Sequence, residues 1–279
     1  MTMAQIARTQ GGRVTSVRRL AYSHPIFRRA VGPVFVLVLW HCASTYGWVD
    51  ARFVPAPLTV LNSLKEWMFG PIGVSPYSGT WFTHAFNSFY RVVGGFLIAS
   101  VFGVVLGCVI GWSRLTSDLL DPIIQIARPI PITAWVPFAV IFFGIRDGSA
   151  FFLIALGAFF PIVVNTAAGV AGTPKLLVRA ARMLGIRKRN ILPRVVLPSA
   201  MPYIFTGLRL GIGLAWVLVI VAEMMAVKSG LGFAMWDAYY FLRMDIIIAA
   251  MLSVGLLGFM SDLVIKMIGN YILRWSRGL

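Results

Sequence analysis

Long apolar runs constrain this chain more strongly than any other feature of its sequence. A helix needs about 20 mostly apolar residues to cross the hydrocarbon core of a bilayer. Six runs reach or approach this length, and the third is short and contains three prolines. We therefore predict an all-α integral membrane protein with six transmembrane helices, at residues 30–48, 92–112, 129–145, 149–170, 203–227 and 246–268.

The composition supports a membrane protein. Hydrophobic residues make up 59% of the chain and charged residues 12%, which is about half the charged share of ordinary soluble domains. Segment 57–69 is mixed in character, and we expect a short amphipathic helix at the membrane interface. The first 29 residues carry six arginines and no small-residue cleavage site after a short apolar core. We expect a basic cytoplasmic tail at 1–29 and a transmembrane domain at 30–279.

The charges are distributed unevenly between the two sides that six spans define. With a cytoplasmic N-terminus, all but six of the 25 lysines and arginines fall on the cytoplasmic side; the exceptions are Arg52, Lys65, Arg91, Arg146, Lys228 and Arg243. The net charge of +16 is then cytoplasmic, as the positive-inside rule describes. We predict that both termini are cytoplasmic, and the charge marks topology rather than a nucleic-acid partner.

Four residues in the predicted spans are candidates for a functional role inside the membrane, such as lining a pathway or forming a gate. Ionisable side chains inside a membrane are costly, so Arg209 and Glu223 of the fifth span are functional candidates. They lie fourteen residues apart, about 21 Å along a helix, and cannot pair with each other there. Trp135 and Pro137 belong to the proline-broken third span, where freed backbone groups either line a cavity or meet other helices.

The segment between the fourth and fifth predicted spans, residues 173–198, forms the most informative loop. Thr173-Pro174 is typical of a helix start, with a hydroxyl cap followed by proline. At helical spacing, apolar residues then fall on one face and basic residues on the other. Gly185 stands where a left-handed C-terminal cap belongs. We expect a second short helix at 190–197 that Pro198 ends. The pattern predicts a helix–turn–helix that either presses into lipid or docks into a soluble partner.

This loop resembles the EAA loop of ATP-binding cassette (ABC) importer permeases. The family pattern is Glu-Ala-Ala, three residues, Gly, nine residues, then Ile-x-Leu-Pro. Here Arg179-Ala180-Ala181, Gly185 and Val195-x-Leu197-Pro198 keep both spacings, with Arg179 in place of the usual Glu. The resemblance implies that the loop is a coupling helix that docks into an ATPase, while Arg179 puts any ion pair of the family Glu in doubt. The implied coupling residues are Arg179, Ala180, Ala181, Arg182, Met183, Leu184, Gly185, Leu197 and Pro198.

Further segments resemble permeases of the sulfonate, taurine and nitrate importers, so that the similarity extends over about residues 33–275. They are 128–137, 143–145, 159–162, 207–216, 222–224 and 230–232. The resemblance implies a type I importer permease, in a bacterial inner (cytoplasmic) membrane, that carries a small anion by alternating access. Its implied partners are two ATPase subunits that use ATP and Mg, a second permease copy in a homodimer, and a periplasmic or lipid-anchored solute-binding protein.

Nothing in the sequence points to chemistry on this chain itself. No phosphate-binding loop of the form G-x4-G-K-[ST] occurs, and no catalytic triad or metal-ligand cluster stands out. We expect a transport subunit that is not an enzyme and binds no cofactor or metal.

Two alternatives to the importer remain at this stage. An ion-gradient-driven secondary transporter usually shows buried acidic relays or inverted repeats, and a structural subunit of a membrane complex would explain the spans but not the loop. A soluble nucleic-acid binder is excluded by hydropathy.

Overall fold

The computed structural model describes residues 25–50 and 52–274, with side chains from residue 31 onward. The chain divides into two units, Met1–Asn62 and Ser63–Leu279. Every regular element in the described ranges is helical. The predicted basic tail at 1–29 lies mostly outside the described residues.

The first unit contains α2 (Pro25–Thr45), and α3 (Pro57–Phe69) begins at its end. The apolar part of α2, Val31–Thr45, is shorter than the 20 or so residues that a straight crossing needs. Within this helix, the indole of Trp40 donates a hydrogen bond to the carbonyl of Pro55 (3.1 Å) in the segment before α3. The bounds of α3 coincide with the mixed segment for which a short helix was predicted.

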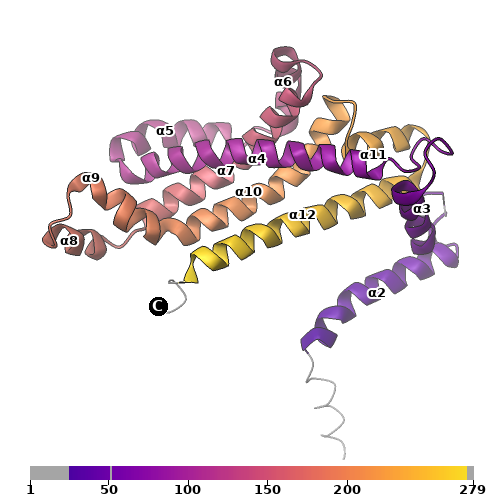
Figure 1. The fold of residues 1–279 in the computed structure, drawn as a ribbon, viewed down its shortest axis with the longest axis horizontal. Helices are drawn as coiled ribbons and strands as arrows, with labels where there is room; N and C mark the ends of the chain where they lie inside the picture. The colour runs from indigo at the N-terminus through magenta and orange to yellow at the C-terminus, as the bar shows by residue number, and fades with distance from the viewer. Residues whose placement is uncertain (1–24, 51, 275–279) are drawn as a thin grey trace, which may run out of the picture. The chain divides into compact units, whose positions relative to one another are not determined.

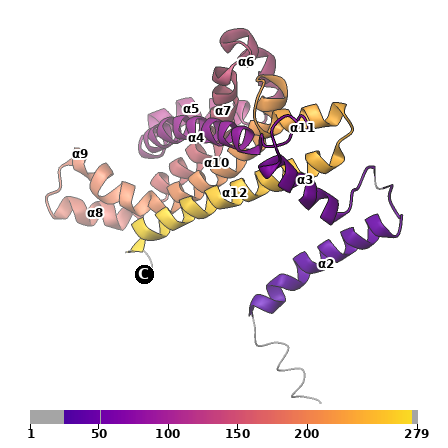
Figure 2. The ribbon, with the colours of Figure 1, turned by 45° about the vertical axis from the view of Figure 1, so that its right-hand side comes forward.

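Four long apolar helices form the second unit: α4 (Trp81–Trp112), α7 (Asp147–Ala171), α10 (Leu197–Met225) and α12 (Met244–Ile272). They lie side by side, with α7 packed against α4 and α10, and α12 against α10 (Figures 1 and 2). The short helix α11 (Leu231–Tyr240) lies at one end of this bundle. At the opposite end lie α8 (Lys175–Met183) and α9 (Lys188–Ile191).

Glycines allow the close approach of α4 and α7. A Cβ added at Gly103 would lie 2.8 Å from Cγ2 of Ile162, and one added at Gly107 would lie 2.6 Å from Cβ of Thr166. Small residues of this kind let helix backbones pack closely in membranes, where lipid tails give no hydrophobic drive for association. The glycines of α4 that face α7 therefore permit this close packing.

The second and third predicted spans need correction. The second predicted span begins at residue 92, whereas α4 begins eleven residues earlier at Trp81, so that Arg91 lies inside the helix. The third is not one helix. Instead, α5 (Arg114–Ala127) is followed by a break, the short turn η2 (Ile132–Trp135) and α6 (Val136–Phe143), and the two arms meet at a bend of 93°. Pro129 and Pro131 fall in the break, where proline removes backbone donors and disfavours helix.

The described residues contain four helices long and apolar enough to cross a membrane, or five if the bent pair counts as one span. The prediction of six spans is not confirmed in number, because α2 is short in its described apolar part and the third span is broken.

The loop between α7 and α10 is helical as predicted, with two differences. Thr173 does not cap α8; its hydroxyl donates back to the carbonyl of Gly169 (3.4 Å). Pro198 does not end a helix either, because α9 continues through a wider π-turn, η3 (Leu192–Val196), directly into α10. In that turn the amide of Leu197 donates to the carbonyl of Leu192, and such local widening re-forms hydrogen bonds that prolines interrupt.

Candidate functional site: a coupling loop and a buried charge network

The C-terminus of α8 is closed by a complete Schellman motif. Gly185 has φ +79°. Its amide donates to the carbonyl of Arg182 (3.0 Å), and the amide of Ile186 donates to that of Ala181 (3.1 Å). A Cβ at Gly185 would meet nothing within 4 Å. The glycine is therefore required by its left-handed backbone and not by space, which confirms the predicted cap.

The coupling-loop residues split into a buried and an exposed group. Ala181 is 5% exposed and belongs to the packed face of α8, where Val178 and Ile186 pack against the buried cluster around Ile191. Leu197 and Pro198 are half-buried in the first turn of α10. The exposed members are Arg179, Ala180, Arg182, Met183, Leu184 and Gly185.

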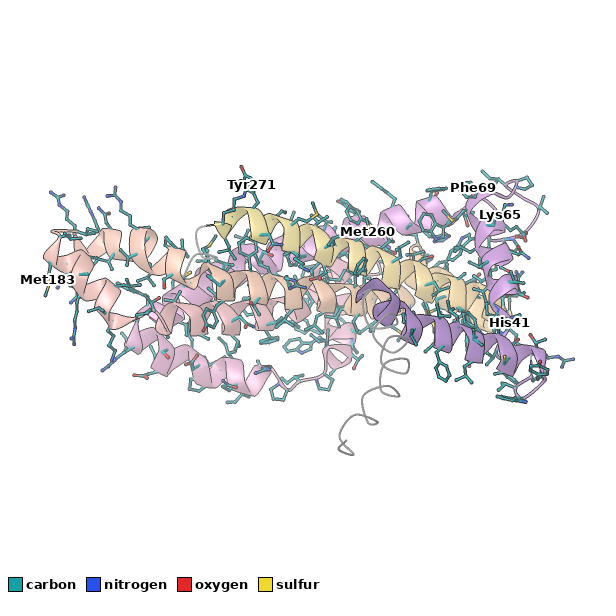
Figure 3. All side chains as sticks on the ribbon, turned by 90° about the horizontal axis from the view of Figure 1, so that it is seen from below. His41, Lys65, Phe69, Met183, Met260 and Tyr271 are labelled. Atoms are coloured by element: carbon teal, nitrogen blue, oxygen red, sulfur yellow. The ribbon has the colours of Figure 1, made fainter. Side chains whose placement is uncertain are left out.

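Apolar side chains at the tip of α8 face outward. Leu176, Met183 and Leu184 are 76%, 88% and 82% exposed, and Met183 lies at the extreme end of the second unit, opposite Phe69 (Figure 3). Exposed basic residues surround them: Lys175, Arg179, Arg182, Arg187, Lys188, Arg189 and Arg194. The loop thus presents an exposed apolar patch of Leu176, Met183 and Leu184, the apolar knob, surrounded by cationic side chains. Val178, Ala181 and Ile186 lie on its packed side.

At the other end of the second unit, Glu223 is fully buried, and α4 and the first turn of α11 supply the hydrogen-bond donors to its carboxylate. Its Oε1 accepts from Nη1 of Arg91 (2.8 Å), and its Oε2 accepts from the hydroxyl of Ser88 (2.8 Å) and the amide of Gly232 (2.9 Å). The Arg91 side chain is itself only 4% exposed. The fifth span's acidic residue therefore pairs with α4 rather than with Arg209.

Arg91 also binds α7 and the turn before α11. Its Nε donates to Oδ1 of Asp147, the first residue of α7 (2.7 Å). Nη1 and Nη2 donate to the carbonyl and the hydroxyl of Ser229 (2.6 and 2.7 Å). We call Ser88, Arg91, Asp147, Glu223 and Ser229 the Arg91 network. It joins α4, α7 and α10 to the α10–α11 turn.

The α10–α11 turn is held to α4 by its backbone as well. The amide of Leu231 donates to the hydroxyl of Ser88 (2.8 Å), and Nδ1 of His84 lies 3.1 Å from the amide nitrogen of Gly230. Gly230 has φ +113°, and a Cβ there would overlap the Glu223 carboxylate. Only glycine fits this position.

Sequence reasoning missed His84, Ser88 and Arg91, because the second predicted span began at residue 92. It missed Asp147 because that residue falls between the third and fourth predicted spans. A signal was present: His84, Ser88 and Arg91 stand at i, i+4 and i+7, one face of a helix.

The remaining pathway candidates lie in different places. Arg209 forms a two-point ion pair with Asp262 of α12 (Nε–Oδ1 and Nη2–Oδ2, both 2.8 Å) at the exposed surface of this chain. Trp135 is half-buried and meets Phe138 edge-on, with ring centroids 5.8 Å apart. Pro137 lines an apolar pocket of about 320 Å³ that Met224 and Met225 also line. The structure therefore brings Pro137 close to the end of α10, while Arg209 lies apart from the Arg91 network.

The part of the chain that the structure describes contains no group of three or more His, Cys, Asp or Glu residues placed to hold a metal ion. The candidate sites are thus built from an exposed docking surface and a buried ion network.

Comparison with known proteins defines the class. The family described as "Binding-protein-dependent transport system inner membrane component" matches residues 99–274, and the chain belongs to this family of ABC importer permeases. Membership implies a multi-pass membrane protein that works with ATPase subunits using ATP and Mg and with a substrate-binding protein. Such permeases are transport subunits and not themselves enzymes.

Particular relatives carry named solutes. The chain is 36% identical to the nitrate import permease NrtB of Synechocystis, covering 86% of this chain and 87% of the relative. It is 33% identical to the putative aliphatic sulfonates permease SsuC of Bacillus subtilis (87% and 85% covered). It is also 33% identical to the taurine permease TauC of Escherichia coli (92% and 94% covered). These relatives confirm the predicted resemblance to sulfonate, taurine and nitrate permeases.

A solved structure shows the same fold. A chain from the inward-facing methionine ABC transporter MetNI aligns with a TM-score of 0.57 at 19% identity, covering 69% of this chain and 94% of that chain.

Proposed function

We propose that the chain forms the translocation pathway for a small anion such as a sulfonate, taurine or nitrate in a bacterial inner membrane. The relatives named above support the anion, since nitrate and sulfonates are oxyanions and taurine carries a sulfonate group. In this proposal two copies form a homodimer, with two ATPase subunits on its cytoplasmic side and a periplasmic or lipid-anchored binding protein on its outer side. Arg209, Glu223, Trp135 and Pro137 belong to the pathway or its gate.

In the proposed topology α2 supplies the first of six spans and both termini are cytoplasmic, with 1–29 as the basic tail. The coupling loop then faces the cytoplasm and the Arg91 network lies near the outer surface. Single cysteines at exposed positions, introduced after Cys42 and Cys108 are replaced by serine, provide the test. Met183→Cys should react with an impermeant maleimide only in inside-out vesicles, and Ile72→Cys only in right-side-out vesicles. The reverse pattern would contradict this orientation.

The observation that best carries the coupling role is the apolar knob at the tip of α8. Met183 and Leu184 are more than four-fifths exposed, although they lie on a helix whose opposite face is packed. An amphipathic helix that lays its apolar face in a partner's groove is a recurrent mode of recognition. Substitution of the buried Ala181 would disturb packing inside this chain. The exposed residues Met183 and Leu184 therefore give a more specific test of docking to the ATPase.

The experiment is purification of the tagged chain in mild detergent, with the ATPase subunit quantified in the eluate. The wild type should retain the ATPase at one copy per permease, and Met183→Asp/Leu184→Asp should lose it while membrane insertion is unchanged. Ile72→Asp is the matched control, because Ile72 is 84% exposed in a loop at the other end of the unit. Equal ATPase recovery from the double variant and the control would exclude α8 as the coupling helix. A wild type that purifies without any ATPase would favour the secondary-transporter alternative.

A further inference from the structure

A pocket of about 510 Å³ opens beside the Arg91 network. Three cationic residues line it, Arg91, Arg146 and Lys228, together with one carboxylate, that of Asp147. Arg146 and Lys228 are exposed, and neither forms an ion pair with a carboxylate of the described residues. The lining therefore carries a surplus of positive charge at the surface of the unit.

Arg91 has a buried side and a side that faces this pocket. Its Nη atoms donate to Glu223 and Ser229, and the side chain as a whole is 4% exposed. Its Nε is held by Asp147, whose side chain is 52% exposed. Because Glu223 is fully buried beside the guanidinium, it balances the Arg91 charge from inside, and the Asp147 carboxylate is the accessible partner.

We propose that this pocket binds the oxyanion group of the transported solute, and that Asp147 is an internal carboxylate which takes the place of that anion on Arg91 when the pocket is empty. The proposal rests on the anion transport proposed above and specifies where the anion is first held. A sulfonate, nitrate or carboxylate group offers the same acceptor geometry to a guanidinium N–H as the Asp147 carboxylate does. Arg146 and Lys228 attract it by charge and hold its other oxygens.

Competition from the Asp147 carboxylate would favour release of the anion, which transport requires, over tight binding. A transport site must bind its solute strongly enough to admit it and weakly enough to release it. Asp147 lowers the affinity of the pocket for anions and occupies Arg91 once the anion moves on, so that the buried guanidinium is never left with an unsatisfied Nε.

The test measures anion binding to the purified full-length chain, with its co-purified partners, in nanodiscs of neutral lipid. The thermal unfolding midpoint is followed against methanesulfonate or nitrate, with chloride at equal ionic strength as the reference. We expect a saturable rise for the oxyanions in the wild type and its loss in Arg146→Gln/Lys228→Gln. The double variant Arg114→Gln/Lys266→Gln removes two exposed charges elsewhere and should respond as the wild type does.

The variant Asp147→Asn tests whether the Asp147 carboxylate competes with the anion for Arg91 or only links α7 to α4. Removal of the competing charge should lower the half-saturating oxyanion concentration about two- to five-fold, the range expected for an exposed charge interaction. An unchanged or higher half-saturating concentration would overturn the proposal, as would a wild-type response in Arg146→Gln/Lys228→Gln or no oxyanion response in the wild type.

These results are distinguishable from a failure of the proposed function. The pocket proposal fails alone if the ATPase co-purifies and hydrolyses ATP while the substitutions at Arg146, Lys228 and Asp147 leave oxyanion binding unchanged. The proposed function fails if no ATPase co-purifies, and the anion titration still reports on the pocket in that case.

Discussion

The two ends of the second unit differ in where they place side chains that are unfavourable in their surroundings: one end buries charged groups, and the other exposes apolar ones. At the Arg91 end, a guanidinium and a carboxylate are buried, and each is surrounded by hydrogen-bonding partners from other helices. At the α8 end, apolar side chains remain exposed although polar residues surround them. A buried charge is stable only when the same chain satisfies it, whereas an exposed apolar knob is stabilised by a partner. The buried charges at the first end are thus satisfied within one chain, whereas the exposed apolar side chains of α8 are those that the proposed ATPase contact would cover.

The largest predicted loss of stability comes from disrupting the Arg91 network. Arg91→Ala leaves the Glu223 carboxylate buried without its cation, and removing one partner of a buried pair costs about 3–5 kcal/mol. The free energy of unfolding in an SDS titration should fall by this amount. Arg189→Gln is the control, because Arg189 is exposed in the loop between α7 and α10 and forms no ion pair with a carboxylate of the described residues, and such a surface substitution changes stability by at most about 0.5 kcal/mol. Similar losses in the two variants would show that the Arg91 network does not behave as a buried pair.

A second variant examines the same end through its backbone. Gly230→Ala places a Cβ against Glu223 and forces a non-glycine residue to φ +113°, a conformation that costs about 1–3 kcal/mol before any steric term. Gly73→Ala at φ +96° is matched in backbone sign but meets nothing within 4 Å. The Gly230 variant should therefore lose more unfolding free energy than the Gly73 variant. A loss no greater than that of the control would mean that the α10–α11 turn is free to move away from Glu223.

At the α8 end the corresponding glycine should matter less to global stability. Gly185→Ala strains one left-handed residue with free space around it, which costs about 1–2 kcal/mol. Because α8 is short and Ala181 is its one buried residue, we expect local opening rather than unfolding, seen as faster hydrogen exchange of α8 amides with unchanged exchange in α7. Gly213→Ala, in the helical backbone of α10 with no contact within 4 Å of an added Cβ, should leave α8 exchange unchanged. Faster exchange throughout the bundle in Gly185→Ala would contradict this local anchoring.

The smallest predicted effect concerns a tyrosine of the loop before α4. Tyr77 is buried and donates to Oδ2 of Asp237 (2.8 Å), and burial, with this hydrogen bond second, raises the pKa of Tyr77 above its ordinary value of 10.0. The neutral phenol is favoured in the folded chain, so its contribution to stability is present below pH 10 and is lost as the pH rises above it. Tyr77→Phe should cost about 1 kcal/mol at neutral pH and lack that alkaline loss. Parallel wild-type and variant curves of unfolding free energy between pH 9 and 11 would contradict the role of Tyr77.

The helical form of the loop between α7 and α10 was predictable because its signals are local. Helical spacing, a glycine at the C-cap and the alanine pair all lie within a few residues of one another, and the structure places α8 and its Schellman motif where they indicate. The errors there, at Thr173 and Pro198, arose because a hydroxyl and a proline each have more than one favourable setting. Thr173 donates back along α7, and Pro198 is accommodated by the π-turn before it.

The Arg91 network was not predictable from the same kind of reasoning. A hydropathy window excludes arginine, so the second span was begun after Arg91, and the partners of that arginine lie 56, 132 and 138 residues away along the chain. Arg209 likewise finds Asp262 across 53 residues. Which opposite charge meets which is decided by helix packing.

The sequence by itself determined that this chain is helical, apolar and membrane-bound, that it carries an amphipathic loop before its next-to-last span, and that it resembles importer permeases, because composition and short-range periodicity express those properties directly. The tertiary structure alone decided that the third span is bent, that Glu223 is buried against Arg91, and that Asp147 joins that pair to an open cationic pocket. Such facts depend on contacts between distant helices, and the free energy of a buried ion exists only once those helices have packed.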